Sequence, residues 1–258
     1  MDKKVIFMDL DGTIIDHTIN DVPASTKATI ANLQAEGHLV VIATGRPPAL
    51  FYNIEKTLNI DTYIAANGRF VKHKGTVLLQ DYIAPHIVDA FVKDMESRNI
   101  DVGFETADDY VIHKKTSDIV SQFSKHFHLE EPKEIYNFHQ SNNVLQMIMF
   151  TDNHQQEKTF KKYPELDFNI SCRYGIDINA QGGMKEVGVD VLINHLNVKR
   201  ENTIAIGDGY NDIGMIKHVH IGIAMGNACQ PLKDVADMVT DSANQDGIEK
   251  AIKKLNLL

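Results

Sequence analysis

Short apolar runs alternate with amphipathic segments over the first eighty residues. The apolar runs are "VIFMDLD", "HLVVIATGR" and "TYIAANG", which begin at Val5, His38 and Thr62 and are typical of buried strands. Between them, "VPASTKATIANLQAEG" and "PPALFYNIEKTLNI" have helical spacing, and the first carries Pro23 near its start and Gly37 near its end. Strands that alternate singly with helices predict a parallel sheet with helices on its faces.

The pattern changes over residues 82–181. A helical stretch, "HIVDAFVKDMESRN", precedes "DVGFETADDYVIHK", which predicts a hairpin with Asp108 and Asp109 at its turn. A strand ("VLQMIMFTD"), a helix ("QQEKTFKKY") and another strand ("FNISCRYGIDINA") follow, and the βα rhythm resumes from residue 184. We therefore predict an α/β fold: a doubly wound, Rossmann-like parallel-sheet core formed by 1–81 and 182–258, with an inserted α+β cap domain at 82–181.

Composition narrows the class of protein. The 258 residues carry a net charge of −9 with a pI near 5.7, which argues against a nucleic-acid partner or an anionic membrane. No apolar run approaches the roughly 18 residues of a membrane span, and the first residues do not resemble a signal peptide. Cys172 and Cys229 lie too far apart in sequence for a metal-type pair and suit a reducing compartment. We expect a cytoplasmic protein, and the sequence predicts no particular oligomeric state.

Polar residues follow several predicted strands or open the helices beside them. In doubly wound sheets, ligands bind outside the carboxyl ends of the strands, so these side chains should meet at one edge. They are Asp9 and Asp11, Thr44 and Gly45, Lys185, and Asp208, Gly209, Asn211 and Asp212.

The charges predict the ligand. Two carboxylates at about 4 Å repel by roughly 4 kcal/mol at an effective dielectric near 20, so Asp9, Asp208 and Asp212 should converge only around a cation. Oxygen ligands without Cys or His suit Mg²⁺ before Zn²⁺. Lys185 at a helix start and the Thr44 hydroxyl would hold an anion. A metal and an anion together indicate a phosphate site, and no "GxxxxGK[ST]" segment is present for a nucleotide-binding loop.

At these residues the sequence resembles the haloacid dehalogenase superfamily of phosphohydrolases, and within it the Cof-like group with a large α/β cap. The matching segments are "DLDGT" (9–13), "ATGR" (43–46), Lys185 and "GDGYND" (207–212), joined by "AANG" (65–68) and "GIAMGNA" (222–228). One departure is Glu186, since the group commonly has Gly after this lysine.

The resemblance implies a role for each matching residue. Asp9 would attack phosphorus and form an aspartyl-phosphate, and Asp11 would protonate the leaving oxygen and later deprotonate water. The phosphate-binding residues would be Thr44, Gly45, Lys185 and Asn211, and the Mg²⁺ site would comprise Asp9, the backbone carbonyl of Asp11, Asp208 and, through the water shell, Asp212. The second aspartate favours a phosphatase over a dehalogenase, because an alkoxide needs a proton and a halide does not.

Other polar residues receive weaker assignments. Arg46, Asn67, Arg173 and Tyr174 are candidates for contact with the leaving group. The histidine pairs at 126/128 and 218/220 lack a third nearby ligand and should be surface or partly buried side chains instead of metal ligands.

We expect a Mg²⁺-dependent phosphatase of a small phosphorylated metabolite, such as a sugar phosphate or a phosphorylated cofactor, with the cap excluding water during turnover. Two alternatives stay open. A phosphotransferase or phosphomutase would use the same aspartyl-phosphate with another acceptor, and a non-catalytic sensor would only bind the phosphorylated ligand.

Overall fold

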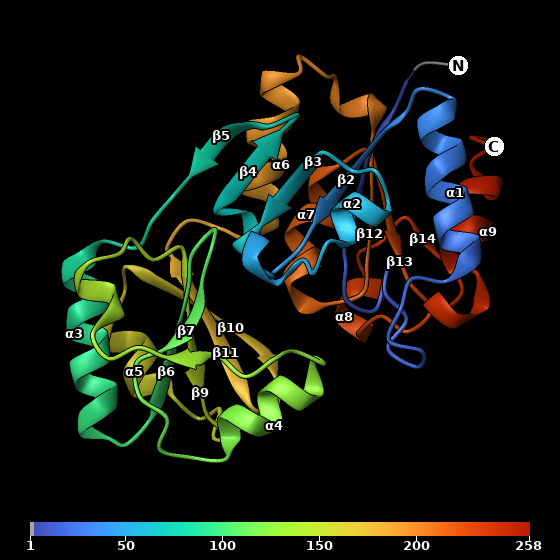
Figure 1. The fold of residues 1–258 in the computed structure, drawn as a ribbon. Helices are drawn as coiled ribbons and strands as arrows, with labels where there is room; N and C mark the ends of the chain where they lie inside the picture. Colours follow the sequence, from blue (N-terminus) through green and yellow to red (C-terminus); the bar gives the residue numbers. More distant parts are fainter. Residues whose placement is uncertain (1–2) are drawn as a thin grey trace. The chain divides into compact units, whose positions relative to one another are not determined.

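An eight-stranded sheet forms the core of the first of two units in the computed structural model, which describes residues 3–258 (Figure 1). This unit contains the described residues through Gly45, together with Asn53–Leu79 and Gly183–Leu258, and the second unit contains Arg46–Tyr52 and Gln80–Gly182. The strand order is β14-β13-β12-β1-β2-β3-β4-β5. The strands are β1 (Val5–Met8), β2 (Leu39–Ala43), β3 (Thr62–Ala65), β4 (Phe70–His73), β5 (Thr76–Gln80), β12 (Thr203–Gly207), β13 (Ile221–Ala224) and β14 (Met238–Val239).

The six strands from β14 to β3 are parallel, and β4 runs antiparallel to β3. From β1 the chain moves to β2 on one side, and from β12 it moves to β13 on the other. Because such crossovers are right-handed, their helices fall on opposite faces of the sheet. The order reverses between β1 and β12, which makes their carboxyl ends the expected ligand position of a doubly wound sheet.

Helices cover both faces of this sheet. The blue α1 and the red α9 lie side by side, and α6 and α7 pack together away from them (Figure 1). In α1, Thr26, Thr29, Ile30 and Leu33 are buried at helical spacing, and Gly37 follows the helix with φ +79°, a conformation that ends helices. The helices of the unit are α1 (Ala24–Ala35), α2 (Ile54–Thr57), α6 (Lys185–His195), α7 (Ile213–His218), α8 (Gln230–Lys233) and α9 (Gly247–Lys254).

The second unit is built on a six-stranded sheet of order β10-β11-β9-β6-β7-β8, in which every pair except β7–β8 is antiparallel. The side chains of this sheet point alternately to its two faces. Phe104 belongs to the hydrophobic cluster that includes buried residues of α3, and Ile148 belongs to the cluster that includes buried residues of α4. The strands are β6 (Asp101–Glu105), β7 (Tyr110–Ile112), β8 (Lys133–Glu134), β9 (Gln146–Phe150), β10 (Leu166–Cys172) and β11 (Gly175–Ala180), and the helices are α3 (Pro85–Ser97), α4 (Ile119–His126) and α5 (Glu157–Lys162).

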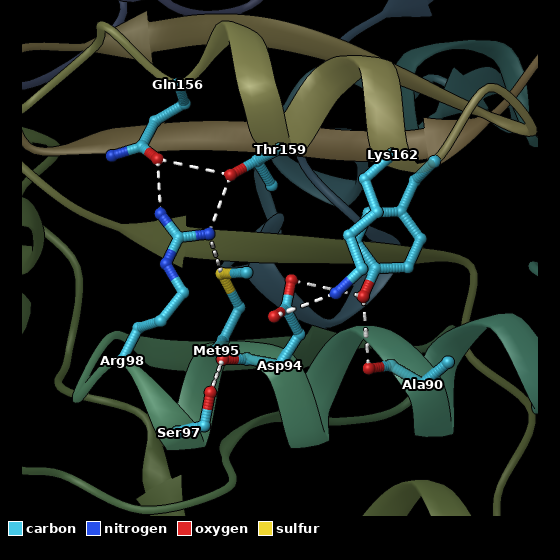
Figure 2. Close-up of polar contacts among 9 residues, drawn as sticks. Ala90, Asp94, Met95, Ser97, Arg98, Gln156, Thr159 and Lys162 are labelled. Carbon is cyan, nitrogen blue, oxygen red and sulfur yellow. Dashed lines mark hydrogen bonds and ion pairs between the residues drawn. The ribbon is translucent and has the colours of Figure 1, made fainter.

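Polar contacts tie the short helix α5 to α3 (Figure 2). The Arg98 guanidinium, at the end of α3, donates to Gln156 Oε1 (2.6 Å) and to Thr159 Oγ1 (2.7 Å). Lys162 pairs with Asp94 of α3 at 2.9 Å. A six-residue helix is too short to persist alone, so these contacts and its apolar side hold it in place.

The predicted fold class is confirmed, and three local predictions are wrong. The predicted helix 47–60 is two short pieces, Pro48–Leu50 and α2, because Tyr52 and Asn53 adopt left-handed conformations between them. The predicted strand 168–180 is a hairpin of β10 and β11. The first sheet is also not purely parallel, since β4 reverses after β3. No helix of the described part is both long and apolar enough to cross a bilayer.

Candidate active site

The end of β1 places the Asp9 carboxylate against the Lys185 ammonium. The Asp9 N–H still donates to Ile206 O of β12 (2.9 Å), so the strand geometry continues into this residue. The Asp9 side chain is 8% exposed, and its Oδ1 lies 2.5 Å from Lys185 Nζ, which is fully buried. An apolar strand thus ends in a buried negative charge that a buried positive charge compensates.

Asp9, Asp208 and Asp212 form an acidic cluster, in which one oxygen of each carboxylate lies within 4.8 Å of the others. Burial raises the pKa of Asp9 well above its ordinary value; Lys185 opposes this shift, and the neighbouring carboxylates add to it. Burial, followed by repulsion from Asp212, raises the pKa of Asp208 to about 7. A hard divalent cation would remove this penalty, and the oxygen-only donors of the cluster fit one.

Asp212 is held more completely than its two neighbours. Its Oδ1 accepts from Lys185 Nζ (2.6 Å), and its Oδ2 accepts from the backbone N–H groups of Asp208 (3.0 Å) and Gly209 (2.9 Å). A Cβ on Gly207 would lie 2.5 Å from the Asp212 carboxyl carbon, so glycine is required for this close approach. With both oxygens committed, Asp212 is better placed to organise the site than to bind an ion directly.

The loop after β1 folds back on itself. Ile14 N donates to Asp9 O (3.2 Å), and Ile15 N donates to Leu10 O (2.8 Å). Gly12 has φ +80°, and a Cβ there would lie 2.2 Å from Asp208 Oδ2, so the turn brings backbone directly onto the acidic cluster. Asp11 lies in this loop and is partly exposed, whereas Asp9 before it is buried.

Thr44, Asn67 and Asn211 lie together beside the ends of β2 and β3. Asn67 is fully buried, has φ +51°, and donates its N–H to Thr44 O (3.2 Å). Its Oδ1 accepts from Asn211 Nδ2 (2.9 Å). A Cβ on Gly45 would lie 3.2 Å from Asn67 Oδ1, so Gly45 belongs to the same group. The structure therefore brings together Thr44, Gly45 and Asn211, which were predicted as anion ligands, with Asn67, which was predicted to contact the leaving group.

Two contributors were not predicted from the sequence. Thr13 Oγ1 donates to Asp208 Oδ1 (3.0 Å), and Asn227 Nδ2 donates to Gly12 O (2.8 Å) and Asp208 Oδ2 (3.1 Å). Both orient the Asp208 carboxylate. The segments "DLDGT" and "GIAMGNA" contain them, but Thr13 lies 195 positions from Asp208 and Asn227 lies 215 positions from Gly12 in the chain.

Two predicted substrate residues belong to the second unit. Arg46 Nη1 donates to Leu50 O (3.0 Å), and the Arg173 guanidinium lies 5.7 Å from the centre of the Tyr174 ring. Their contact with a leaving group stays a prediction. The histidines of the two pairs are exposed or half-buried, as predicted: His126, His128, His218 and His220. Within residues 3–258, the acidic cluster is the one group of three carboxylate, imidazole or thiolate side chains close enough to share a metal ion. The four histidines do not belong to it.

This arrangement has two halves with opposite charge requirements. Carboxylates at the ends of β1 and β12 attract a cation, whereas Lys185, Thr44 and Asn211 supply donors for an anion. A phosphate group with a bound divalent ion satisfies both halves at once.

Comparisons with known proteins agree with this chemistry. A sequence model of the haloacid dehalogenase-like hydrolases matches residues 6–252. The chain is 34% identical to "Putative phosphatase YkrA" of Bacillus subtilis (strain 168) over the full length of both proteins. It is 27% identical to the pyridoxal phosphate phosphatase YbhA of Escherichia coli (strain K12), covering 98% of each chain.

A solved structure described as the subclass IIB sugar phosphatase BT4131 superposes with a TM-score of 0.91 at 28% identity, covering 99% of this chain and 100% of the other. The expectation of a phosphatase of this superfamily is thereby confirmed. From its sequence over residues 6–252 and its fold, the chain belongs to the haloacid dehalogenase-like hydrolases.

Proposed function

We propose that this protein is a Mg²⁺-dependent phosphatase that hydrolyses small phosphorylated metabolites through an aspartyl-phosphate on Asp9. The observation that carries the proposal is the position of Asp9: a buried carboxylate at the switch point of the sheet, 2.5 Å from Lys185 and within the acidic cluster. A surface or purely structural aspartate would not require burial beside two further carboxylates.

The chain's own residues divide the reaction. A carboxylate oxygen of Asp9 bonds to phosphorus while the ester O–P bond breaks, and Asp11 gives a proton to the leaving oxygen. Water then attacks phosphorus and gives a proton to Asp11, and the Asp9–phosphorus bond breaks to release inorganic phosphate. Lys185, Thr44 and Asn211 hold the transferring oxygens.

The acidic cluster would hold the ion through Asp9, Asp208 and the backbone carbonyl of Asp11, with Asp212 supporting its water shell. When bound, Mg²⁺ supplies positive charge that offsets the negative charge of the phosphoryl group. The donor set supports this proposal. The Asp9 carboxylate has a second oxygen beyond the one bonded to Lys185. The Asp208 oxygens accept only from the neutral side chains of Thr13 and Asn227, so the negative charge of this carboxylate is not balanced by those partners.

Small metabolites are the proposed substrates because the relatives named above act on pyridoxal phosphate and on sugar phosphates. We propose that the insertion 82–181 is the cap domain of the family and limits the site to substrates of this size. Transfer to a second alcohol instead of water is the alternative activity, and free phosphate compared with phosphorylated acceptor distinguishes the two.

The test is phosphate release from p-nitrophenyl phosphate and from a panel of phosphorylated sugars and cofactors, with Mg²⁺ and with a chelator. We expect turnover that stops on chelation, and Asp9→Asn should lower kcat by at least ~10³-fold. Asp190→Asn, which changes an exposed aspartate of α6, is the matched control. Metal-independent turnover, or an active Asp9→Asn protein, would refute the proposed mechanism.

A further inference from the structure

Glu186 directly follows Lys185 and turns its carboxylate back along the chain. Its Oε1 accepts from the backbone N–H of Met184 at 3.1 Å, the peptide from which α6 begins. Its Oε2 is buried and accepts no hydrogen bond from the described residues. A buried carboxylate oxygen without a donor is unusual in a folded protein and calls for a reason beyond stability.

The segment that carries Lys185 is fixed at each successive peptide. Arg69 Nη2 donates to Gly183 O (2.7 Å), and Glu186 accepts from Met184 N. A Cβ on Gly68 would lie 2.3 Å from Met184 O, so the backbone of Gly68 packs directly against the next peptide group, between Met184 and Lys185. These contacts determine where α6 begins and therefore where the Lys185 side chain starts.

Glu186 also fills the space above Gly214 in α7. A Cβ on Gly214 would lie 2.0 Å from Glu186 Oε2 and 2.4 Å from its carboxyl carbon, and its three nearest atoms would all belong to Glu186. The helix α7 follows Asp212, the second carboxylate that binds Lys185. One side chain thus packs between the segment that supplies the ammonium and the segment that supplies its partner.

We propose that Glu186 is a positioning residue for Lys185: its carboxylate fixes the Met184 peptide and spaces α6 from α7, and thereby sets the ammonium between Asp9 and Asp212. This inference rests on the proposed function, in which Lys185 holds the transferring phosphoryl group. Glu186 itself touches no reacting atom.

If Glu186 positions Lys185, substitutions of Glu186 should change catalysis and phosphate binding in a defined pattern. Glu186→Gly removes both the hydrogen bond and the spacer, so we expect kcat/KM to fall and the inhibition constant of inorganic phosphate to rise, each by about 10-fold. Glu186→Gln keeps an acceptor for Met184 N–H and should retain most of the activity. Asn194→Gly also places glycine at an exposed position of α6 and controls for the loss of helix stability.

Gly214→Ala supplies the decisive comparison. In the otherwise native protein the new methyl group displaces the Glu186 carboxylate and should reproduce the loss seen for Glu186→Gly. In the Glu186→Gly background the space is empty, so the same alanine should cost little. Losses that simply add would show that Gly214 acts independently of Glu186 and would overturn the proposal.

The experiment combines steady-state kinetics on p-nitrophenyl phosphate with calorimetric binding of inorganic phosphate in Mg²⁺, at a temperature where all variants are folded. Native kinetics and native phosphate affinity in Glu186→Gly would refute the positioning role. If the native protein and Lys185→Met are equally inactive, the proposed function fails, and the phosphate-binding comparison still decides whether Glu186 positions Lys185.

Discussion

The Lys185 ammonium lies 2.6 Å from Asp212 Oδ1, and both side chains are fully buried. Burial alone would lower the pKa of Lys185, but Asp212 and Asp9 outweigh it and raise the pKa above the ordinary lysine value, so the ammonium stays charged. One cation therefore neutralises part of the charge of two buried carboxylates, and we expect both folding and catalysis to depend on it.

Lys185→Met tests this dependence. The substitution keeps the apolar stem and removes the charge, so two buried carboxylates lose their partner and the free energy of unfolding should fall by about 3–5 kcal/mol at neutral pH. Urea unfolding in a chelator measures it. Lys27→Met, which breaks the exposed pair with Asp21, should leave the midpoint nearly unchanged, and an equal loss in both variants would contradict the argument.

The affinity for Mg²⁺ should depend on pH through Asp208. Because burial raises the pKa of this carboxyl to about 7, it holds a proton below that pH, and an ion must displace the proton to bind. Below pH 7 we expect the Mg²⁺ concentration for half-maximal activity to rise by about tenfold per pH unit. Metal titrations of phosphate release between pH 5.5 and 8.5 provide the measurement, and a constant value over this range would exclude Asp208 as a ligand.

Thr13→Val should change the pH dependence of activation by Mg²⁺. The Thr13 hydroxyl donates to Asp208 Oδ1 and lowers the pKa of that carboxyl, against the larger effect of burial. Without the hydrogen bond the pKa should rise, and the Mg²⁺ activation curve should shift to higher pH by about one unit. Thr29→Val alters a buried threonine of α1 and is the control, since it should leave the curve in place. A profile unchanged in both variants would show that Thr13 does not tune the site.

Asp11→Asn should separate substrates by their leaving groups. A proton from Asp11 matters most for an alkoxide, which leaves poorly without it, so alkyl phosphates should slow by about 10²–10⁴-fold. The leaving group of an aryl phosphate is a stabilised phenolate, which departs without a proton, so hydrolysis of aryl phosphates should slow much less. Single-turnover rates on a matched alkyl and aryl pair measure the difference; equal losses would exclude the acid role of Asp11.

The meeting of the strand ends could be predicted from sequence because it follows from parallel topology. Asp9 and Asp208 end the adjacent strands β1 and β12, and buried apolar runs before each of them mark those ends. The acidic cluster and its neighbour Lys185 were predicted in this way. Their catalytic roles stay proposals that the variants above address.

The parts that sequence did not reveal depend on signals that are weak or distant. The hairpin of β10 and β11 turns at Arg173 and Tyr174, which lack the Gly, Asn or Pro typical of tight turns. The predicted helix 47–60 is interrupted by left-handed conformations at Tyr52 and Asn53. Asn53 is only a weak signal for this break, and a tyrosine gives none. The bond between Asn227 and Gly12 joins residues 215 positions apart, which no periodicity can indicate.

Arg98→Met should loosen α5 without affecting the first unit. Figure 2 shows the guanidinium reaching Gln156 and Thr159, which are both buried, and hydrogen bonds from a charged donor contribute about 1.5–3 kcal/mol each. Their loss should raise amide hydrogen exchange over 157–162 by at least ~10-fold while exchange in β1 and β12 stays native. Lys93→Met removes an exposed lysine from α3 and is the control. Unchanged exchange in α5 would mean that its apolar side alone holds the helix against α3.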